Sequence, residues 1–233
     1  MSPILFAVYI DGLVKKVCGK SGSILSVILY ADDILLLTPT IYLLQQLLRL
    51  CETELIWLDM LINAKKSCCM RIGPRFNVHC EPILTMSGDQ LPWVNELRYL
   101  GVFIVSSRHF KCSLAHAKRS FYRASNAIFG KIGRVASEEV VLELLTKKCF
   151  PALLYGLEAC CLNKSEEKSL NFPCVRFLMK LFRTSNYEII QEVCEFFGLS
   201  EPSVLLKKRK TRFLLKYKQS ANLICKVCSS FTD

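Results

Sequence analysis

The chain has 233 residues, enough for one large domain or two small ones. Its composition, 52% hydrophobic with a mean hydropathy of +0.30, excludes an intrinsically disordered chain. Lys and Arg number 31 against 20 Asp and Glu, a net charge of +11. That charge fits a polyanionic partner, nucleic acid before an acidic membrane, and equally fits a basic surface with no partner.

Thirteen cysteines raise the question of disulfide bonds. The N-terminus has neither a basic n-region nor a small-residue cleavage pattern, so it does not resemble a secretory signal peptide. In a chain that is not secreted, we expect the thiols to be reduced and packed as small apolar groups. Two metal-like spacings, Cys225 with Cys228 and His109 with Cys112 and His116, are weak signals, and packed side chains explain them better.

Asp32 and Asp33 interrupt the longest apolar stretch of the chain. No segment therefore reaches the roughly eighteen uninterrupted apolar residues of a membrane span. We expect an intracellular protein, cytoplasmic or nuclear, with no membrane partner.

The first half of the chain mixes helical and strand-like patterns. Ser2-Pro3 and the apolar spacing after it predict a helix over residues 3–17. Two β-branched apolar runs around the turn "YADD" predict a hairpin between residues 24 and 37. A regular apolar stripe predicts a helix from Pro39 to about Asn63. Further strands are expected at 68–73, around Leu84, around Leu91 and at 97–105.

The second half is helical by its periodicity. Leu114 to Arg134 is predicted as one long basic helix, and Ser137 and Ser165 are expected to begin two more. Ser185 and Glu188 have the spacing of a capping box. Pro202 begins the last helix, which carries the dense basic cluster "KKRKTR". The predicted fold class is α+β, with a mixed half over residues 1–107 and an all-helical half over 108–233.

The pair Asp32 and Asp33 places two negative charges between strands that are built to be buried. Burying carboxylates is costly unless a cation or a donor compensates them. A hairpin turn would hold two carboxylates exposed on a rigid support, which suits Mg²⁺ and phosphoryl-transfer chemistry. From these residues alone, an Asp-Asp pair that simply makes a good turn is the more common explanation.

Several further motifs, which follow one another in the order found in a known protein family, favour the catalytic explanation of the aspartate pair over the simple turn. The chain resembles the reverse transcriptase of non-LTR (LINE-type, jockey-like) retrotransposons. Tyr30-Ala31-Asp32-Asp33 is similar to the catalytic hairpin of that family, and "SPILFAVYIDGL" resembles the segment just upstream of it. Asn63 to Ser67 resembles the Asn-x-x-Lys-Ser/Thr element, and Tyr99-Leu100-Gly101 the primer-grip hairpin. "PALLYGLEAC", "FLMKLFRTSN" and "PSVLLKKR" are similar to the helical region beyond the palm.

The resemblance implies a partial reverse-transcriptase palm over residues 1–107, followed by a helical thumb and C-terminal region over 108–233. It implies Asp32 and Asp33 as ligands of two Mg²⁺ ions, and Lys66 as a proton donor or charge neutraliser for departing pyrophosphate. RNA template and DNA primer are the implied partners. The residues expected to contact nucleic acid are Tyr30, Tyr99, Leu100, Gly101, Lys118, Arg119 and Arg123.

The sequence departs from the family at its start. Fingers, a further palm strand with a third catalytic aspartate, and a Gln-Gly pair would precede the Ser-Pro in a family member. Asp11 lies in mid-helix and does not replace that aspartate. We therefore expect the chain alone to be inactive and its catalytic hairpin to have an unpaired edge.

Three interpretations compete. The chain is a decayed fragment of a retrotransposon polymerase, which we favour, or a genuine polymerase whose upstream part is missing from the gene model. The third is a non-enzymatic module that uses its basic helices to bind nucleic acid.

Overall fold

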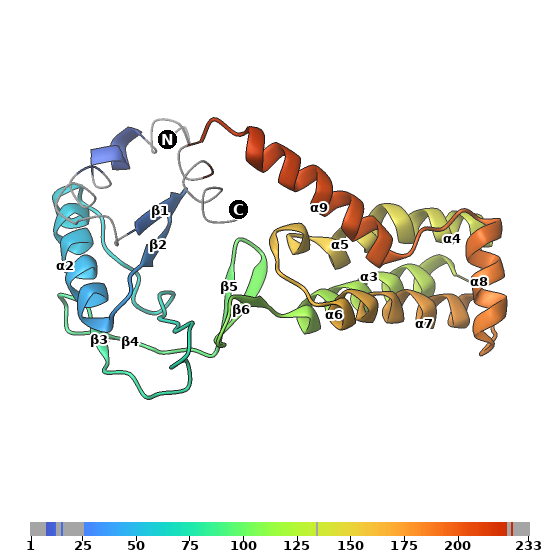
Figure 1. Cartoon of the computed structure of the whole chain (residues 1–233), viewed down its shortest axis with the longest axis horizontal. Helices are drawn as coiled ribbons and strands as arrows, with labels where there is room; N and C mark the ends of the chain where they lie inside the picture. Colours follow the sequence, from blue (N-terminus) through green and yellow to red (C-terminus); the bar gives the residue numbers. More distant parts are fainter. Residues whose placement is uncertain (1–7, 13–14, 16–25, 134, 223–224, 226–233) are drawn as a thin grey trace. The chain divides into compact units, whose positions relative to one another are not determined.

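The computed structural model describes residues 8–12, 15, 26–133, 135–222 and 225. The chain forms two compact units, of which the first holds residues 1–97 and 106–109 and the second holds 98–105 and 110–233 (Figure 1). These units follow from contacts within the chain and do not define polymerase subdomains. The division into a palm over 1–107 and a thumb over 108–233 stays a prediction.

The first unit is built around a β-hairpin and one helix. β1 (Ser26–Tyr30) pairs antiparallel with β2 (Asp33–Leu37), and this confirms the predicted hairpin. α2 (Ile41–Trp57) begins at Thr40, whose hydroxyl oxygen accepts a hydrogen bond from the Leu43 N–H at 3.2 Å. Val27 packs with Leu47, Cys51 and Leu55 of α2 in one buried cluster, and Leu29, Ile34 and Leu36 pack against it. Residues 8–12 are helical, and Ile10 is buried in the same cluster.

α2 ends six residues before Asn63, where the apolar stripe had predicted its end. Asp59 has a φ of 56°, and Met60 donates its N–H to the Leu55 carbonyl at 2.8 Å. This is the Schellman arrangement, which stops a helix with one residue in the left-handed conformation. The apolar residues after it continue the core without continuing the helix.

Beyond α2 the first unit is mostly loop. β3 (Ile83–Leu84) and β4 (Gln90–Leu91) are the short strands predicted around Leu84 and Leu91, and they pair antiparallel. The strand expected at 68–73 is wrong, because this segment forms only an isolated bridge between Cys69 and Trp93. A second buried cluster joins Leu48 of α2 to Cys69, Ile83 and Leu91, so these loops are anchored on the helix.

The strand predicted at 97–105 is in fact a hairpin. β5 (Glu96–Tyr99) and β6 (Val102–Val105) flank a two-residue turn, and β7 (Lys111–Cys112) completes a sheet of order β5-β6-β7. Leu100 has a φ of 47° and Gly101 a φ of 84°. Positive φ at both central residues is the signature of the tight turn that joins two strands. One of the boundaries between the two units falls within β5, between residues 97 and 98.

The second unit is otherwise helical, which confirms the predicted α+β class with helices after the sheets. Its long basic helix α3 begins after Ser113, as predicted. The helical elements in chain order are α3 (Leu114–Ile132), α4 (Glu138–Leu144), the π-helical η1 (Leu145–Cys149), α5 (Phe150–Leu154), the 3₁₀ turn η2 (Leu157–Ala159), α6 (Lys164–Ser169), α7 (Asn171–Leu181), α8 (Tyr187–Phe196) and α9 (Pro202–Gln219).

Two helix caps differ from the predicted ones. α6 is capped by Asn163, whose side chain accepts from the Glu166 N–H at 2.8 Å, and Ser165 lies inside the helix. α8 is capped by Asn186, not Ser185. In both places an Asn stands close to the Ser, and Asn is at least as good an N-cap.

The core of the second unit is a single large cluster. Phe121 of α3 and Phe150 of α5 are almost fully buried, and their ring centroids lie 6.4 Å apart. Cys149 and Cys174 are buried in the same cluster. Burial raises the pKa of the Cys149 thiol to about 11 and that of Cys174 to about 12, so both are protonated, apolar groups.

Cys112 and Cys160 form a disulfide, which corrects the expectation that all thiols are reduced. The bond joins β7 to the residue that follows η2. The spacing of these two cysteines, 48 residues apart, gave no sign of the pairing. The suggested cluster of His109, Cys112 and His116 is not a metal site, because Cys112 is in this bond and the His116 ring stacks on Phe103 at 3.5 Å.

Candidate active site and nucleic-acid contacts

The tip of the β1–β2 hairpin carries the aspartate pair. Tyr30 and Asp33 face each other as the last cross-strand pair, so Ala31 and Asp32 alone form the turn. Ala31 has a φ of 51°, a left-handed conformation that lets the chain reverse in two residues. Asp32 and Asp33 are both exposed. The apolar strands thus fix the turn on α2 while both carboxylates face solvent.

The two faces of this hairpin differ. Val27, Leu29, Ile34 and Leu36 face α2, and side chains alternate along a strand, so Tyr30 and Asp33 lie on the opposite face. Tyr30 is 61% exposed. The Tyr30 ring and the Asp33 carboxylate are therefore presented together, as cross-strand neighbours on the same face of the hairpin.

Comparison with known protein families gives a match in the first part of the chain. Residues 1–104 match the family model of reverse transcriptase (RNA-dependent DNA polymerase). The matched region includes the whole hairpin and ends within β6. No curated protein and no solved structure matches the chain.

Reverse transcriptases use divalent metal ions, and carboxylate oxygens are the ligands that Mg²⁺ prefers. Apart from Asp233, every Asp and Glu of the chain lies in the described part. Within that part, no three His, Cys, Asp or Glu side chains gather closely enough to hold a metal ion. Asp32 and Asp33 have the right donor chemistry, but the described residues do not make up a complete two-metal site.

Asp11, the acidic residue that precedes the hairpin, is engaged elsewhere. Its carboxylate lies 2.6 Å from the Lys15 Nζ, one helical turn away. A hydrogen bond to Asp11 raises the pKa of Lys15, and the attraction of the two charges adds to it. Tyr9, on the same segment, donates its hydroxyl to the Leu58 carbonyl at 3.0 Å.

Lys66 lies in a turn that Asn63 builds. The Asn63 side-chain oxygen and its carbonyl both accept from the Lys66 N–H, at 3.2 Å and 3.0 Å. The carbonyl also accepts from Ser67 at 3.0 Å. Lys66 itself is exposed, so the Asn-x-x-Lys spacing has a local cause: the amide closes the turn and the lysine projects from it.

The turn at Leu100 and Gly101 is held by a tyrosine that the sequence did not single out. The Tyr155 hydroxyl donates to the Leu100 carbonyl at 3.2 Å, and a Cβ added at Gly101 would meet the Tyr155 ring at 2.9 Å. Tyr99 is half-buried and Leu100 is 39% exposed. The contact joins residues 55 apart in sequence, so only the fold reveals it.

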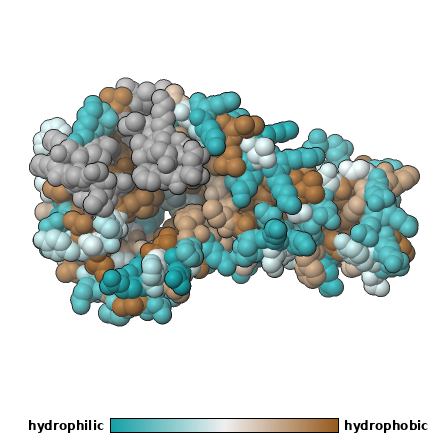
Figure 2. All heavy atoms as spheres, in the orientation of Figure 1, coloured by the Kyte–Doolittle hydropathy of each residue, from teal (hydrophilic) through white to brown (hydrophobic). Residues whose placement is uncertain are grey.

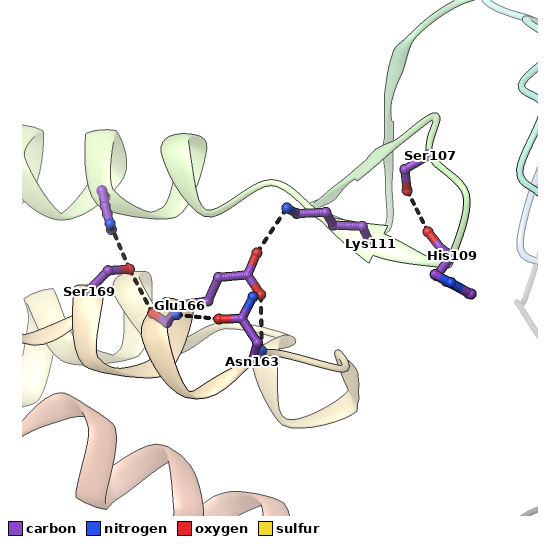
Figure 3. Close-up of polar contacts among 7 residues, drawn as sticks. Ser107, His109, Lys111, Asn163, Glu166 and Ser169 are labelled. Atoms are coloured by element: carbon purple, nitrogen blue, oxygen red, sulfur yellow. Dashed lines mark hydrogen bonds and ion pairs between the residues drawn. The ribbon is translucent and has the colours of Figure 1, made fainter. Parts of the chain in front are cut away.

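A second link holds the sheet of the second unit to its helices. The Lys111 Nζ lies 2.9 Å from a carboxylate oxygen of Glu166, the residue that closes the α6 capping box with Asn163 (Figure 3). The backbone hydrogen bond from Asn163, followed by the hydrogen bond from Lys111, lowers the pKa of Glu166 below its usual 4.5. Together with Cys112–Cys160 and Tyr155–Leu100, this link fixes β5–β7 on the helices.

The three cations of α3 that were predicted to contact nucleic acid differ in their exposure and in their hydrogen bonds. Lys118 is half-buried, and its Nζ donates to the Ser169 hydroxyl of α6 at 2.9 Å. Arg119 and Arg123 are exposed, stand one turn apart on the same face, and make no side-chain hydrogen bond or ion pair with the described residues. The geometry suits the two arginines to phosphate contact and gives Lys118 a role in packing α3 on α6.

No helix in the described part of the chain is long and apolar enough to span a bilayer.

Proposed function

We propose that the chain is part of a non-LTR retrotransposon reverse transcriptase, with its catalytic palm hairpin and the helical region that follows. The observation that carries the proposal is the exposed Asp32-Asp33 pair at the tip of a two-residue hairpin turn, inside the region that matches the reverse transcriptase family. The parent activity is RNA-templated DNA synthesis by two-metal nucleotidyl transfer. Its partners are an RNA template and a DNA primer.

Each site residue has a role in this proposal. Asp32 and Asp33 are the Mg²⁺ ligands, and bound Mg²⁺ supplies charge neutralisation for phosphoryl transfer. Lys66 is exposed on a fixed turn, where its charge can meet a departing polyphosphate. Tyr30, on the same face as Asp33, packs beside the primer end. Tyr99, Leu100 and Gly101 position the primer, and the Tyr155 hydrogen bond keeps that turn in place.

The chain by itself is proposed to be inactive. Mg²⁺ dehydrates reluctantly and demands near-ideal geometry, so two adjacent carboxylates hold it weakly. Activity would require a further carboxylate and a nucleotide-binding surface supplied by other polypeptide.

Primer extension on an RNA template tests the proposal. The chain alone is compared with a fusion in which the fingers and first palm strand of an active non-LTR reverse transcriptase precede it. We expect Mg²⁺-dependent extension by the fusion and none above background by the chain alone. Robust extension by the chain alone would refute its inactivity, and a correctly folded but inert fusion would refute the assignment of the hairpin.

A non-enzymatic nucleic-acid-binding module is the second candidate function. It is favoured by the exposed Arg119 and Arg123, which could contact phosphates without any metal site. Nucleic-acid binding by the chain, with an inert fusion, would select this candidate.

A further inference from the structure

A groove opens in the second unit between α7, α8 and the start of α9. Its volume is about 420 Å³, at the lower end of the range of about 300–1,000 Å³ that is usual for ligand sites. In Figure 1 α8 stands crosswise at one end of the helices of this unit. The walls of the groove are mainly apolar and are formed by Cys174, Val175, Leu178, Ile190, Leu199 and Pro202.

The groove lies in an acidic part of a basic chain. Residues 184–206 hold four Glu and no Lys or Arg, although the whole chain has a net charge of +11. Glu195 and Glu201 line the groove, and none of the described Lys or Arg side chains does. Figure 2 shows hydrophilic and hydrophobic side chains next to each other at this end of the unit. The groove therefore repels polyanions and attracts a ligand that combines apolar and cationic groups.

Glu188, Glu192 and Glu195 form a ridge on α8 beside the groove, called the α8 acidic ridge below. At 100° per residue they fall within about 60° of the helix circumference and follow one another over about two turns. All three are exposed, and none forms an ion pair or a side-chain hydrogen bond with residues that the structure describes. Like charges at this spacing repel one another, so cations from a partner would stabilise the ridge.

Glu201 adds a fixed negative charge on the α9 side of the groove. Its Oε2 accepts hydrogen bonds from the Asn171 amide at 2.7 Å and from the Ser203 hydroxyl at 3.2 Å. These neutral donors hold the carboxylate in place without neutralising it. Burial raises the pKa of the Cys194 thiol, which also lines the groove, and the charge of Glu201 adds to that shift. The negative field of Glu201 thus reaches the interior of the groove, where Cys194 stays a neutral thiol.

We propose that the groove and the α8 acidic ridge bind a basic amphipathic helix of a protein partner. An apolar side chain of that helix fills the groove, and the Lys or Arg side chains on either side of it meet Glu201 and the ridge. A small organic cation would leave most of the ridge uncovered, because the ridge extends about 10 Å along α8. The inference goes beyond the proposed function, because no residue of the groove belongs to the β1–β2 hairpin or to α3.

The test measures binding of the full chain to a fluorescent peptide with leucines on one face and lysines on the other, about 18 residues long so that it can be helical. Anisotropy is recorded at a series of salt concentrations, and the same peptide with Glu in place of each Lys is the control ligand. The α8 variant carries Glu188→Gln, Glu192→Gln and Glu195→Gln. The control variant loses the same charge on α4 through Glu138→Gln, Glu139→Gln and Glu143→Gln, all at exposed positions. Thermal unfolding of both variants verifies that the fold is kept.

Gln191 allows the groove itself to be tested. Its side chain is exposed and lines the groove, so a substitution there leaves the core intact. Gln191→Lys places a positive charge in the groove and Gln191→Glu a negative one, and Lys, Glu and Gln have similar helix propensities. We expect Gln191→Lys to weaken binding of the basic peptide and Gln191→Glu to strengthen it.

The basic peptide is expected to bind the wild-type chain, and the acidic peptide is not. The α8 variant should bind the basic peptide about 10-fold more weakly at low salt, the combined effect of three exposed charge pairs, and the control variant should stay within about 2-fold of the wild-type chain. Equal losses in the α8 and control variants, or equal binding by Gln191→Lys and Gln191→Glu, would overturn the proposal. Self-association of the chain in sedimentation velocity, stronger than peptide binding and abolished in the α8 variant, would overturn it in favour of a second copy as the occupant.

Discussion

At the scale of single residues, the packing of the β5–β6 hairpin on the helices depends on two glycines. Gly101 and Gly156 both have a positive φ, 84° and 69°, and both lie against a side chain of the opposing element. A Cβ added at Gly156 would come within 2.5 Å of a Val102 methyl group. Glycine is needed here for backbone conformation and for space at the same time.

Gly156→Ala is therefore expected to lower the free energy of unfolding by about 1–2 kcal/mol for the left-handed backbone and by about 1–3 kcal/mol more for overpacking. Gly198→Ala is the matched control, because its φ is 61° and no atom lies within 4 Å of the added Cβ. Urea unfolding of the two variants measures the difference. Equal losses of stability would show that Val102 yields freely and that the two elements are not tightly packed here.

At the scale of elements, hydrophobic periodicity correctly predicted the segments in which the spacing of apolar residues matches the period of the helix or strand that forms. The β1–β2 hairpin, α2 and α3 follow their apolar residues closely. Two of the errors occur where one residue has a positive φ that a hydropathy pattern does not reveal: Asp59 at the end of α2, and Leu100 in the middle of "LRYLGVFIV". The hydropathy of Asp or Leu does not specify a left-handed backbone, so the tertiary contacts decide these two positions.

The cations Lys118, Arg119 and Arg123 of α3 show that tertiary contacts also decide which residues of a candidate site are available to a ligand. Their charge on one basic helix predicted that all three contact phosphates, but the structure gives Lys118 a partner on α6, Ser169, which lies 51 residues away in the sequence. Arg119→Gln with Arg123→Gln is expected to flatten the salt dependence of duplex binding by about two and to leave stability unchanged. Lys118→Met should leave that slope almost unchanged and cost about 0.5–1.5 kcal/mol of stability, because its hydrogen bond to Ser169 is removed. A flatter slope in Lys118→Met would return Lys118 to the phosphate-binding face.

At the scale of the whole chain, the two units have separate cores. The clusters around Leu47 and Leu48 belong to the first unit, and the cluster around Phe121 and Phe150 to the second. The family match covers the first unit almost entirely and only the β5–β6 hairpin of the second. The aspartate pair could be found from sequence because its motif is local. The Tyr155–Leu100 and Lys111–Glu166 links could not, because each joins residues about 55 positions apart.

The β1–β2 hairpin is proposed to present the catalytic carboxylates of a reverse transcriptase. The most direct test introduces Asp32→Asn into the fusion that supplies the fingers and first palm strand, and measures the rate of RNA-templated primer extension. Asp59→Asn is the control, because it makes the same chemical change at an exposed position of the same unit, and Asn tolerates its left-handed backbone. We predict that Asp32→Asn lowers the rate by more than about 100-fold, as expected for removal of a metal ligand, while Asp59→Asn stays within about 2-fold of the parent. Extension by the Asp32→Asn fusion at the rate of the control would show that Asp32 is not a catalytic metal ligand.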